Sequence, residues 1–225
     1  MGGPTTCWNL VRDAARGEGA ARDEFARRYE ATVRAYLGAR WRGSWWFHDL
    51  DDAVQDVFVE CLKEGGVLER ADPERRGGFR AFLYGVVRRI ALRYESGRGK
   101  AREGRLSTEA ERRVASDEDT LTRIFDEAYA RSVMQEAARR QAALASQRGR
   151  DAERRVELLR LRFQDELPIR DIAARWGEDA AQVHRAYARA RKEFREALLE
   201  VITFEGASDR TEAERRAAEL LDLLD

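Results

Sequence analysis

The chain has 225 residues, and its 42 Lys and Arg balance 42 Asp and Glu, so the formal net charge of zero argues on its face against nucleic-acid binding. With only 3 prolines and 17 glycines and a hydrophobic content of 43%, the composition predicts an all-α protein. The two distant cysteines, the two histidines and the lack of an apolar run of about 20 residues predict a soluble cytoplasmic protein without metal, cofactor, membrane contact or enzymatic activity.

Helical spacing of apolar residues predicts a first helical domain at residues 8–96. A regular apolar stripe runs from Phe25 to Leu37. The acidic segment Asp49–Asp52 then supplies capping carboxylates to a second helix, which we expect to end at Gly65 and Gly66. After a glycine-rich turn, a strongly periodic basic helix extends from Phe79 to Ala91.

Charge is segregated within this first domain. Six anions and one cation between Asp49 and Glu64 give a net charge of −5, whereas eleven cations and four anions between Arg70 and Arg105 give +7. Cations neutralise phosphates and aromatic faces stack on bases, so the basic helix suits a nucleic-acid strand with exposed bases.

Aromatic residues of this domain have two interpretations. Phe79 and Phe82 are more often core residues, which leaves Tyr84 and the arginines as surface candidates. A second group could form a base-stacking cluster, although core packing under a loop is favoured: Trp41, Trp45, Trp46 and Phe47.

Hydrophobic residues almost vanish at residues 97–118, which predicts a flexible linker. A second helical domain follows at residues 119–203. The last segment, 204–225, is acidic with a net charge of −4, and Thr211 with Glu214 predicts a capping box at the start of a C-terminal helix.

The most specific local pattern lies between Leu167 and Arg185 and predicts a helix-turn-helix. Ala173 is small where two helices must approach closely, and Gly177 can adopt the left-handed conformation that ends the first helix. Asp179 with Gln182 resembles a capping box for the second helix. The expected shared core consists of Ile172, Trp176, Val183 and Tyr187.

Five cations and two anions between Asp179 and Arg195 give this second helix a net charge of +3, which favours DNA as its partner. A plain helical hairpin in a bundle remains the alternative for this segment taken alone, because alanine and glycine are common.

Three motifs in this order and spacing resemble the extracytoplasmic-function group of bacterial RNA polymerase sigma factors: the acid-led segment Asp51–Phe58, the basic helix Phe79–Ala91, and the helix-turn-helix ending Arg189–Lys192. The resemblance covers roughly Asn9 to Ile202. It implies two helical sigma domains on a linker and a protein that directs promoter recognition, DNA melting and transcription initiation.

The resemblance also implies partners and sites. Core RNA polymerase would bind through its clamp coiled coil, on Asp52, Gln55, Asp56 and Phe58. The unwound strand of the minus-ten element would bind Arg75, Arg76, Arg80, Tyr84, Arg88 and Arg89. The second domain would contact the polymerase flap and bind the minus-thirty-five element through Gln182, His184, Arg185, Arg189, Arg191 and Lys192. An anti-sigma factor is a further partner that the resemblance allows.

Some features depart from that family or allow other interpretations. Ala186 stands where many members carry arginine, so the recognition helix offers fewer polar side chains. We also expect Leu220, Leu221 and Leu224 to pack on the protein while the acidic face of the tail masks the recognition helix, against the simpler alternative of a solvated capping helix. His184 could act as a pH switch, but an ordinary surface histidine is favoured.

Two other functional classes remain open. A stand-alone helix-turn-helix regulator would bind duplex operator DNA without polymerase and would use the helix from Asp49 to Glu64 as a dimer face. A purely structural helical adaptor would tolerate the loss of Arg185 and Arg189.

Overall fold

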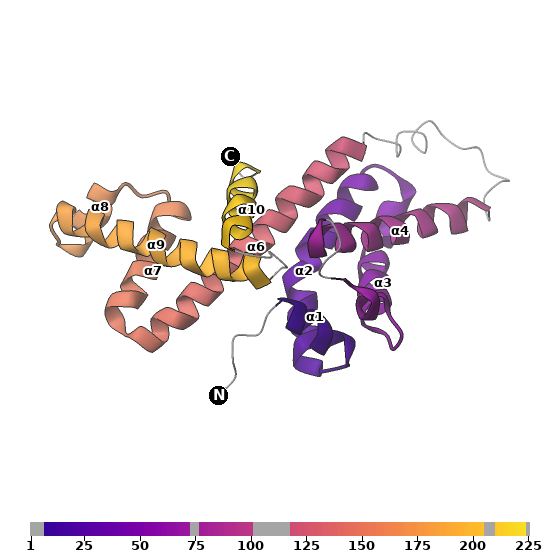
Figure 1. Ribbon diagram of the computed structural model, residues 1–225. Coiled ribbons are helices and arrows are strands. Elements are labelled where there is room, and N and C mark those ends of the chain that lie inside the picture. Colours follow the sequence, from indigo (N-terminus) through magenta and orange to yellow (C-terminus); the bar gives the residue numbers. More distant parts are fainter. Residues whose placement is uncertain (1–6, 73–76, 101–117, 205–209, 224–225) are drawn as a thin grey trace. The chain divides into compact units, whose positions relative to one another are not determined.

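Figure 1 shows the computed structural model of the chain, which describes residues 7–72, 77–100, 118–204 and 210–223. These residues form helices and contain no strand, which confirms the predicted all-α class. The elements are α1 (Cys7–Ala15), α2 (Gly19–Arg40), η1 (Trp45–Asp49), α3 (Leu50–Leu62), η2 (Val67–Arg70), α4 (Gly78–Lys100), α6 (Glu118–Arg148), α7 (Arg150–Phe163), α8 (Ile169–Trp176), α9 (Ala180–Phe204) and α10 (Arg210–Asp222).

The chain divides into two compact units. Unit 1 contains the residues up to Ser132 together with those from Thr203 onward, and unit 2 runs from Val133 to Ile202. The linker was predicted at 97–118 and the second domain from 119. In the structure α4 continues to Lys100, and the first turns of α6 belong to unit 1; residues 101–117 lie outside the described part.

The core of unit 1 follows the apolar stripe of α2. Its members recur every three or four residues and are fully buried: Phe25, Tyr29, Val33, Tyr36 and Leu37. Phe79 of α4 packs on this stripe, with ring centroids 5.9 Å from Phe25 and 5.0 Å from Tyr29. Its burial confirms the core interpretation of Phe79, whereas Phe82 is half-buried.

The turn after α3 requires glycine at one position. A Cβ atom on Gly66 would lie 2.6 Å from the carbonyl oxygen of Lys63 and 2.7 Å from that of Cys61, closer than real Cβ contacts. Gly66 is therefore required by the turn, but α3 ends at Leu62, so the predicted helix end at Gly65 and Gly66 is three residues too late. At the other end of α3, Asp49 occupies the N-cap without a side-chain capping bond, so that part of the prediction is wrong.

The aromatic residues between α2 and α3 differ in how far they are buried. Trp41 is fully buried and its indole Nε1 donates to Glu95 at 3.0 Å, as core packing predicts. Trp45 and Phe47 in η1 are 54% and 48% exposed, so the core interpretation is wrong for these two rings. A short 3-10 helix leaves them on the surface beside the start of α3.

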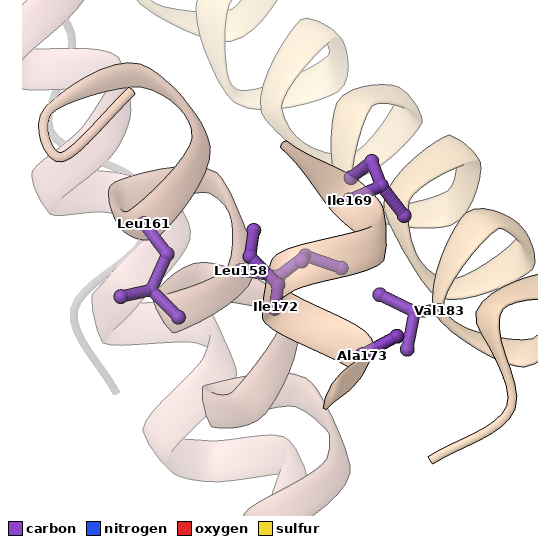
Figure 2. Close-up of a cluster of buried hydrophobic side chains, with 6 residues drawn as sticks. All are labelled: Leu158, Leu161, Ile169, Ile172, Ala173 and Val183. Carbon is purple, nitrogen blue, oxygen red and sulfur yellow. The ribbon is translucent and has the colours of Figure 1, made fainter. Parts of the chain in front are cut away.

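Unit 2 is centred on a small core shared by α7, α8 and α9. Figure 2 shows its buried side chains converging from the three helices: Leu158 and Leu161 from α7, Ile169, Ile172 and Ala173 from α8, and Val183 from α9. Trp176 and Tyr187 pack against its edge. The predicted core of this segment is confirmed, with these two rings only partly buried.

The C-terminal helix α10 begins at Arg210, one residue before the predicted cap Thr211, and Glu214 pairs with Arg210 by accepting from its Nε at 3.3 Å. The predicted capping box is therefore wrong. The buried positions are Ala213 and Ala217, whereas Leu220 is half-buried and Leu221 is 44% exposed. Leu224 lies outside the described residues.

Candidate nucleic-acid interface

The predicted DNA-reading surface of unit 2 depends on how the chain turns between α8 and α9. Gly177 ends α8 in the left-handed conformation, at φ 65° and ψ 32°, which a residue with a Cβ adopts at a cost. Asp179 then caps α9 because its carboxylate Oδ1 accepts from the backbone N–H of Gln182 at 3.1 Å. The left-handed turn at Gly177 is confirmed, and so is the Asp179 half of the predicted capping box; together they fix where α9 begins.

All six residues predicted on α9 are exposed: Gln182, His184, Arg185, Arg189, Arg191 and Lys192. These six residues do not all lie on one face of α9. Gln182, Arg185 and Arg189 lie on the face toward α7, where they line one open cavity. His184 and Arg191 lie on another face of the helix. The guanidinium carbon of Arg191 lies 5.8 Å from the ring centroid of Tyr187.

Two arginines of α7 line the same cavity as these cations, and sequence reasoning missed both. Arg154 lies over the ring of Trp176, 4.4 Å from its centroid, and pairs with Glu178 at 2.7 Å. Arg155 forms a bidentate pair with Glu193 at 2.9 and 2.8 Å. Both arginines line the cavity of about 360 Å³ beside α9. Two adjacent arginines, Arg154 and Arg155, in an amphipathic helix were the sequence feature that could have indicated them.

Arg155 and Arg189 share one carboxylate partner, Glu193. Glu193 accepts from Arg155 and lies 3.4 Å from Arg189, so one carboxylate sits between two guanidinium groups. The hydrogen bond from Arg155 is the main cause that holds the pKa of Glu193 below its usual value. Because Arg155 neutralises Glu193, the positive charge of Arg189 stays available at the surface.

The predicted polymerase-binding residues of α3 have different environments. Asp52 and Gln55 are exposed, whereas Asp56 accepts from Arg93 at 2.8 Å and from the hydroxyl of Tyr94 at 2.9 Å. Phe58 is half-buried, with its ring edge-on to Phe25. The structure therefore leaves Asp52 and Gln55 as the open polar positions among the four.

Exposed apolar side chains accompany the acidic positions of α3. Val59, one turn after Gln55, is 51% exposed, and the exposed rings of Trp45 and Phe47 directly precede the helix. Sequence reasoning missed Val59, because a single valine gives no signal of exposure, and favoured core packing over base stacking for the two rings. We call this set, with Asp52 and Gln55, the α3 surface.

The predicted strand-binding residues of α4 lie against α6. Arg80, Tyr84 and Arg88 recur every four residues on one face of α4, and Glu118, Thr122 and Asp126 recur every four residues on α6. The contacts pair them in opposite order along the two helices. Arg80 donates its Nε to Asp126 at 2.7 Å, and Arg88 lies 3.4 Å from Glu118.

Tyr84 occupies the middle of this pairing. Its hydroxyl donates to Glu118 at 3.1 Å and lies 3.1 Å from the hydroxyl of Thr122, while its ring is edge-on to Phe125. Tyr84 was predicted as a surface residue, but the packing of α6 makes it half-buried. Arg89 is exposed, and Arg75 and Arg76 lie outside the described residues.

A buried cation joins three helices of unit 1 at this place. Arg40 of α2 is 7% exposed and donates to Glu95 of α4 at 2.7 and 3.0 Å and to Glu118 of α6 at 3.1 Å. Partial burial opposes ionisation of Glu118, but hydrogen bonds from Arg40 and Tyr84 hold its pKa below the usual value. Sequence reasoning missed Arg40, because a lone arginine in a charged helix resembles a surface residue.

The acidic face of α10 pairs with its own cations. Glu212, Glu214 and Glu219 each pair with an arginine of the same helix, at spacings of three or four residues. Such pairs are those that stabilise a solvated helix. They support the simpler alternative for the tail over masking of the recognition helix.

Within the described ranges, the structure contains no group of His, Cys, Asp or Glu that could hold a metal ion. None of the helices described is long and apolar enough to span a membrane. In the comparisons with known proteins, no family model, no curated protein and no solved structure matches the chain.

Proposed function

We propose that the protein is a sigma factor of the extracytoplasmic-function type, which binds core RNA polymerase and directs transcription initiation from specific promoters. It acts in the cytoplasm and carries out no catalysis of its own. Its partners are the clamp coiled coil and the flap of polymerase and the promoter DNA, with an anti-sigma factor as a further partner.

The observation that carries this proposal is the exposed basic half of α9, which is held in place by the left-handed turn at Gly177 and the cap at Asp179. A helix that begins at a tight turn and presents Gln182, Arg185 and Arg189 suits the major groove of duplex DNA. Arg154 and Arg155 of α7 line the cavity beside this helix, where each pairs with a carboxylate.

The α3 surface supports the polymerase half of the proposal. Asp52 and Gln55 are exposed beside Val59, so acidic, polar and apolar groups lie on one helix face. A surface of this kind suits a basic amphipathic helix, because carboxylates attract the cations and the apolar groups contribute buried area.

The strand-binding role of α4 rests on weaker support than the other two surfaces. Arg80, Tyr84 and Arg88 contact carboxylates and a hydroxyl of α6, so in this arrangement they do not face solvent freely. Arg88 and Arg89 are both exposed, but Arg88 also lies 3.4 Å from Glu118. The proposal therefore requires that α4 is uncovered before the minus-ten strand binds.

The decisive experiment has two steps. The purified chain is first mixed with core RNA polymerase and tested for co-elution, with Asp52→Arg as the disrupted variant and Glu219→Arg in α10 as a control that makes the same charge change. Holoenzyme is then tested for run-off transcription on a library of bacterial promoter fragments. Co-elution that Asp52→Arg removes, with transcripts that depend on Arg185, is the expected result.

A second candidate function is a stand-alone regulator that binds duplex operator DNA. The covering of Arg80, Tyr84 and Arg88 favours it, because a duplex-binding protein needs no strand-binding face. This candidate predicts Arg185-dependent binding to duplex DNA without polymerase, and no co-elution with polymerase. A structural adaptor predicts neither activity.

A further inference from the structure

Two matched rows of side chains meet between α4 and the start of α6. The row on α4 carries two cations and a phenol, and the row on α6 carries two carboxylates and a hydroxyl. Arg80 faces Asp126, Tyr84 faces Glu118 and Thr122, and Arg88 faces Glu118. Each polar group of the α4 row meets a group of α6 of opposite charge or hydrogen-bonding character. Two helices that met by chance would not be matched in this way.

The groups on α6 occupy the positions that a nucleic-acid strand would need. A carboxylate accepts from a guanidinium in the same forked geometry as a phosphate oxygen pair. The ring of Phe125 lies against Tyr84 with centroids 5.2 Å apart, so an aromatic partner already fills the place next to the ring. The α6 row thus satisfies the polar contacts that a strand would make, and Phe125 beside it meets Tyr84 edge-on where a base would stack.

Apolar packing keeps the α6 row in place. Leu121, Phe125 and Tyr129 recur every four residues and are buried in unit 1, and Tyr129 stacks with Tyr29 at 6.1 Å between centroids. Glu118 is also bound to the buried Arg40. Because burial of large apolar side chains contributes most of the stability of such contacts, the charges alone do not hold α6 on α4.

We propose that residues Glu118–Asp126 of α6 form an internal cover that imitates a nucleic-acid strand on α4 and must leave this face before a single DNA strand binds there. This inference rests on the strand-binding role of α4 in the proposed function. Since apolar packing resists the opening, the free chain binds a single strand weakly, and association with polymerase is what favours the open form.

The test measures binding of a fluorescein-labelled single DNA strand of mixed sequence, about 12 nucleotides long, by fluorescence anisotropy. In the variant Glu118→Gln/Asp126→Asn the carboxylates of the cover are neutral. We expect it to bind the strand about three- to tenfold more tightly than the unmodified chain, because two ion pairs no longer compete with the phosphates. Asp126→Asn alone, which keeps Glu118 as a partner of Arg40, should give a smaller gain in strand affinity.

A charge-matched control separates uncovering from a general loss of negative charge. Glu127→Gln/Glu136→Gln removes the same two charges from α6, but these carboxylates pair with arginines of α6 itself. We expect no gain in strand binding from this variant. Adding Arg80→Ala and Arg88→Ala to the uncovered variant abolishes its gain, because the phosphates then lose their partners.

Hydrogen exchange reports the movement independently of charge. Saturating strand should increase amide exchange in residues 118–132 if α6 leaves α4, and should leave it unchanged or lower if the strand binds elsewhere. Circular dichroism of each variant establishes that it is folded.

Three outcomes would overturn the inference. If the charge-matched control gains as much strand affinity as the uncovered variant, the gain comes from the change in net charge and not from uncovering α4. Strand binding that depends on Arg80 and Arg88 without any gain in the uncovered variant rejects the cover and leaves the proposed function standing. If no variant binds the strand through Arg80 and Arg88, both the cover and the strand-binding role of α4 are wrong, while co-elution with polymerase still tests the polymerase half separately.

Discussion

Tyr84 of α4 donates its hydroxyl to Glu118 of α6 at 3.1 Å, although the two residues are 34 positions apart in the chain. Glu118 also accepts from the buried Arg40, so the same carboxylate joins Tyr84 and Arg88 of α4 to the interior of unit 1. The face of α4 that the sequence assigns to DNA is therefore coupled to the stability of the unit. The first prediction concerns this coupling.

Replacement of Arg40 by methionine should lower the free energy of unfolding by about 3 kcal/mol, because Glu95 loses its bidentate cation and Glu118 keeps only Arg88. Urea denaturation followed by circular dichroism measures the change. The control is Arg27→Met, which removes an exposed pair with Glu24 on the same helix and should cost under about 0.5 kcal/mol. Equal effects of the two substitutions would show that Arg40 does not join the three helices.

The alkaline limit of stability should depend on Tyr36. Burial raises its pKa from 10.0 to about 12, although the charge of Arg40 opposes the rise. Between these values the unfolded chain has lost the phenolic proton and the folded chain has kept it, so the free energy of unfolding falls as the pH rises. Below pH 10 both states are protonated and the contribution is fully present.

Tyr36→Phe should flatten the fall of the free energy of unfolding between pH 10 and 12, because phenylalanine has no proton to lose. Urea titrations at half-unit steps of pH measure the slope for both chains. A variant whose slope equals that of the unmodified chain would mean that the phenol of Tyr36 titrates alike in the folded and unfolded states.

Two glycines should respond in opposite directions to alanine. At Gly177 no atom lies near a new Cβ, so the cost of Gly177→Ala is the left-handed backbone alone, about 1 to 2 kcal/mol. At Gly85 the added Cβ is equally free of contacts but the backbone is helical, so Gly85→Ala should stabilise the chain by about 0.5 to 1 kcal/mol. Thermal unfolding measures both.

Gly177→Asn provides the rescue, because asparagine tolerates the left-handed conformation better than alanine. It should be more stable than Gly177→Ala and should keep the DNA affinity of the unmodified chain. If alanine at position 177 costs nothing, the turn between α8 and α9 is not held in the conformation described.

The exposed cations of α9 should set the salt dependence of DNA binding. Arg189→Ala/Lys192→Ala should reduce the slope of log affinity against log salt by about 2, since each neutralised phosphate releases condensed counterions. Anisotropy with duplex promoter DNA, in the presence of polymerase, measures the slope. Arg215→Ala in α10 removes a cation that is paired within its own helix and should leave the slope unchanged.

Arg155→Leu tests the role of the carboxylate between α7 and α9. With Arg155 gone, Glu193 remains charged and 3.4 Å from Arg189, so it neutralises the cation that would meet a phosphate. The slope should fall by about 1, although Arg155 is mostly buried in the pair with Glu193. Arg155→Leu/Glu193→Gln should restore the slope, whereas an unrestored slope would indicate a direct contact between Arg155 and DNA.

The sequence by itself determined the local features of this protein. The spacing of Phe25, Tyr29 and Val33 predicted a buried helix stripe, and Gly177 with Asp179 predicted a turn and a cap, because these features depend on backbone geometry within a few residues. The exposure of the cations of α9 followed from the same periodicity.

Only the tertiary structure decided which of the predicted surfaces are open. Arg80 and Arg88 look identical to Arg185 in a sequence, yet carboxylates of α6 pair with the first two, whereas Arg185 lines an open cavity beside α7. The sequence gives a net charge of zero, but only the fold shows that Glu118 and Asp126 are among the carboxylates that contact the basic helix. Contacts between residues tens of positions apart leave no local pattern, so the choice between a free and a covered basic face belongs to the fold.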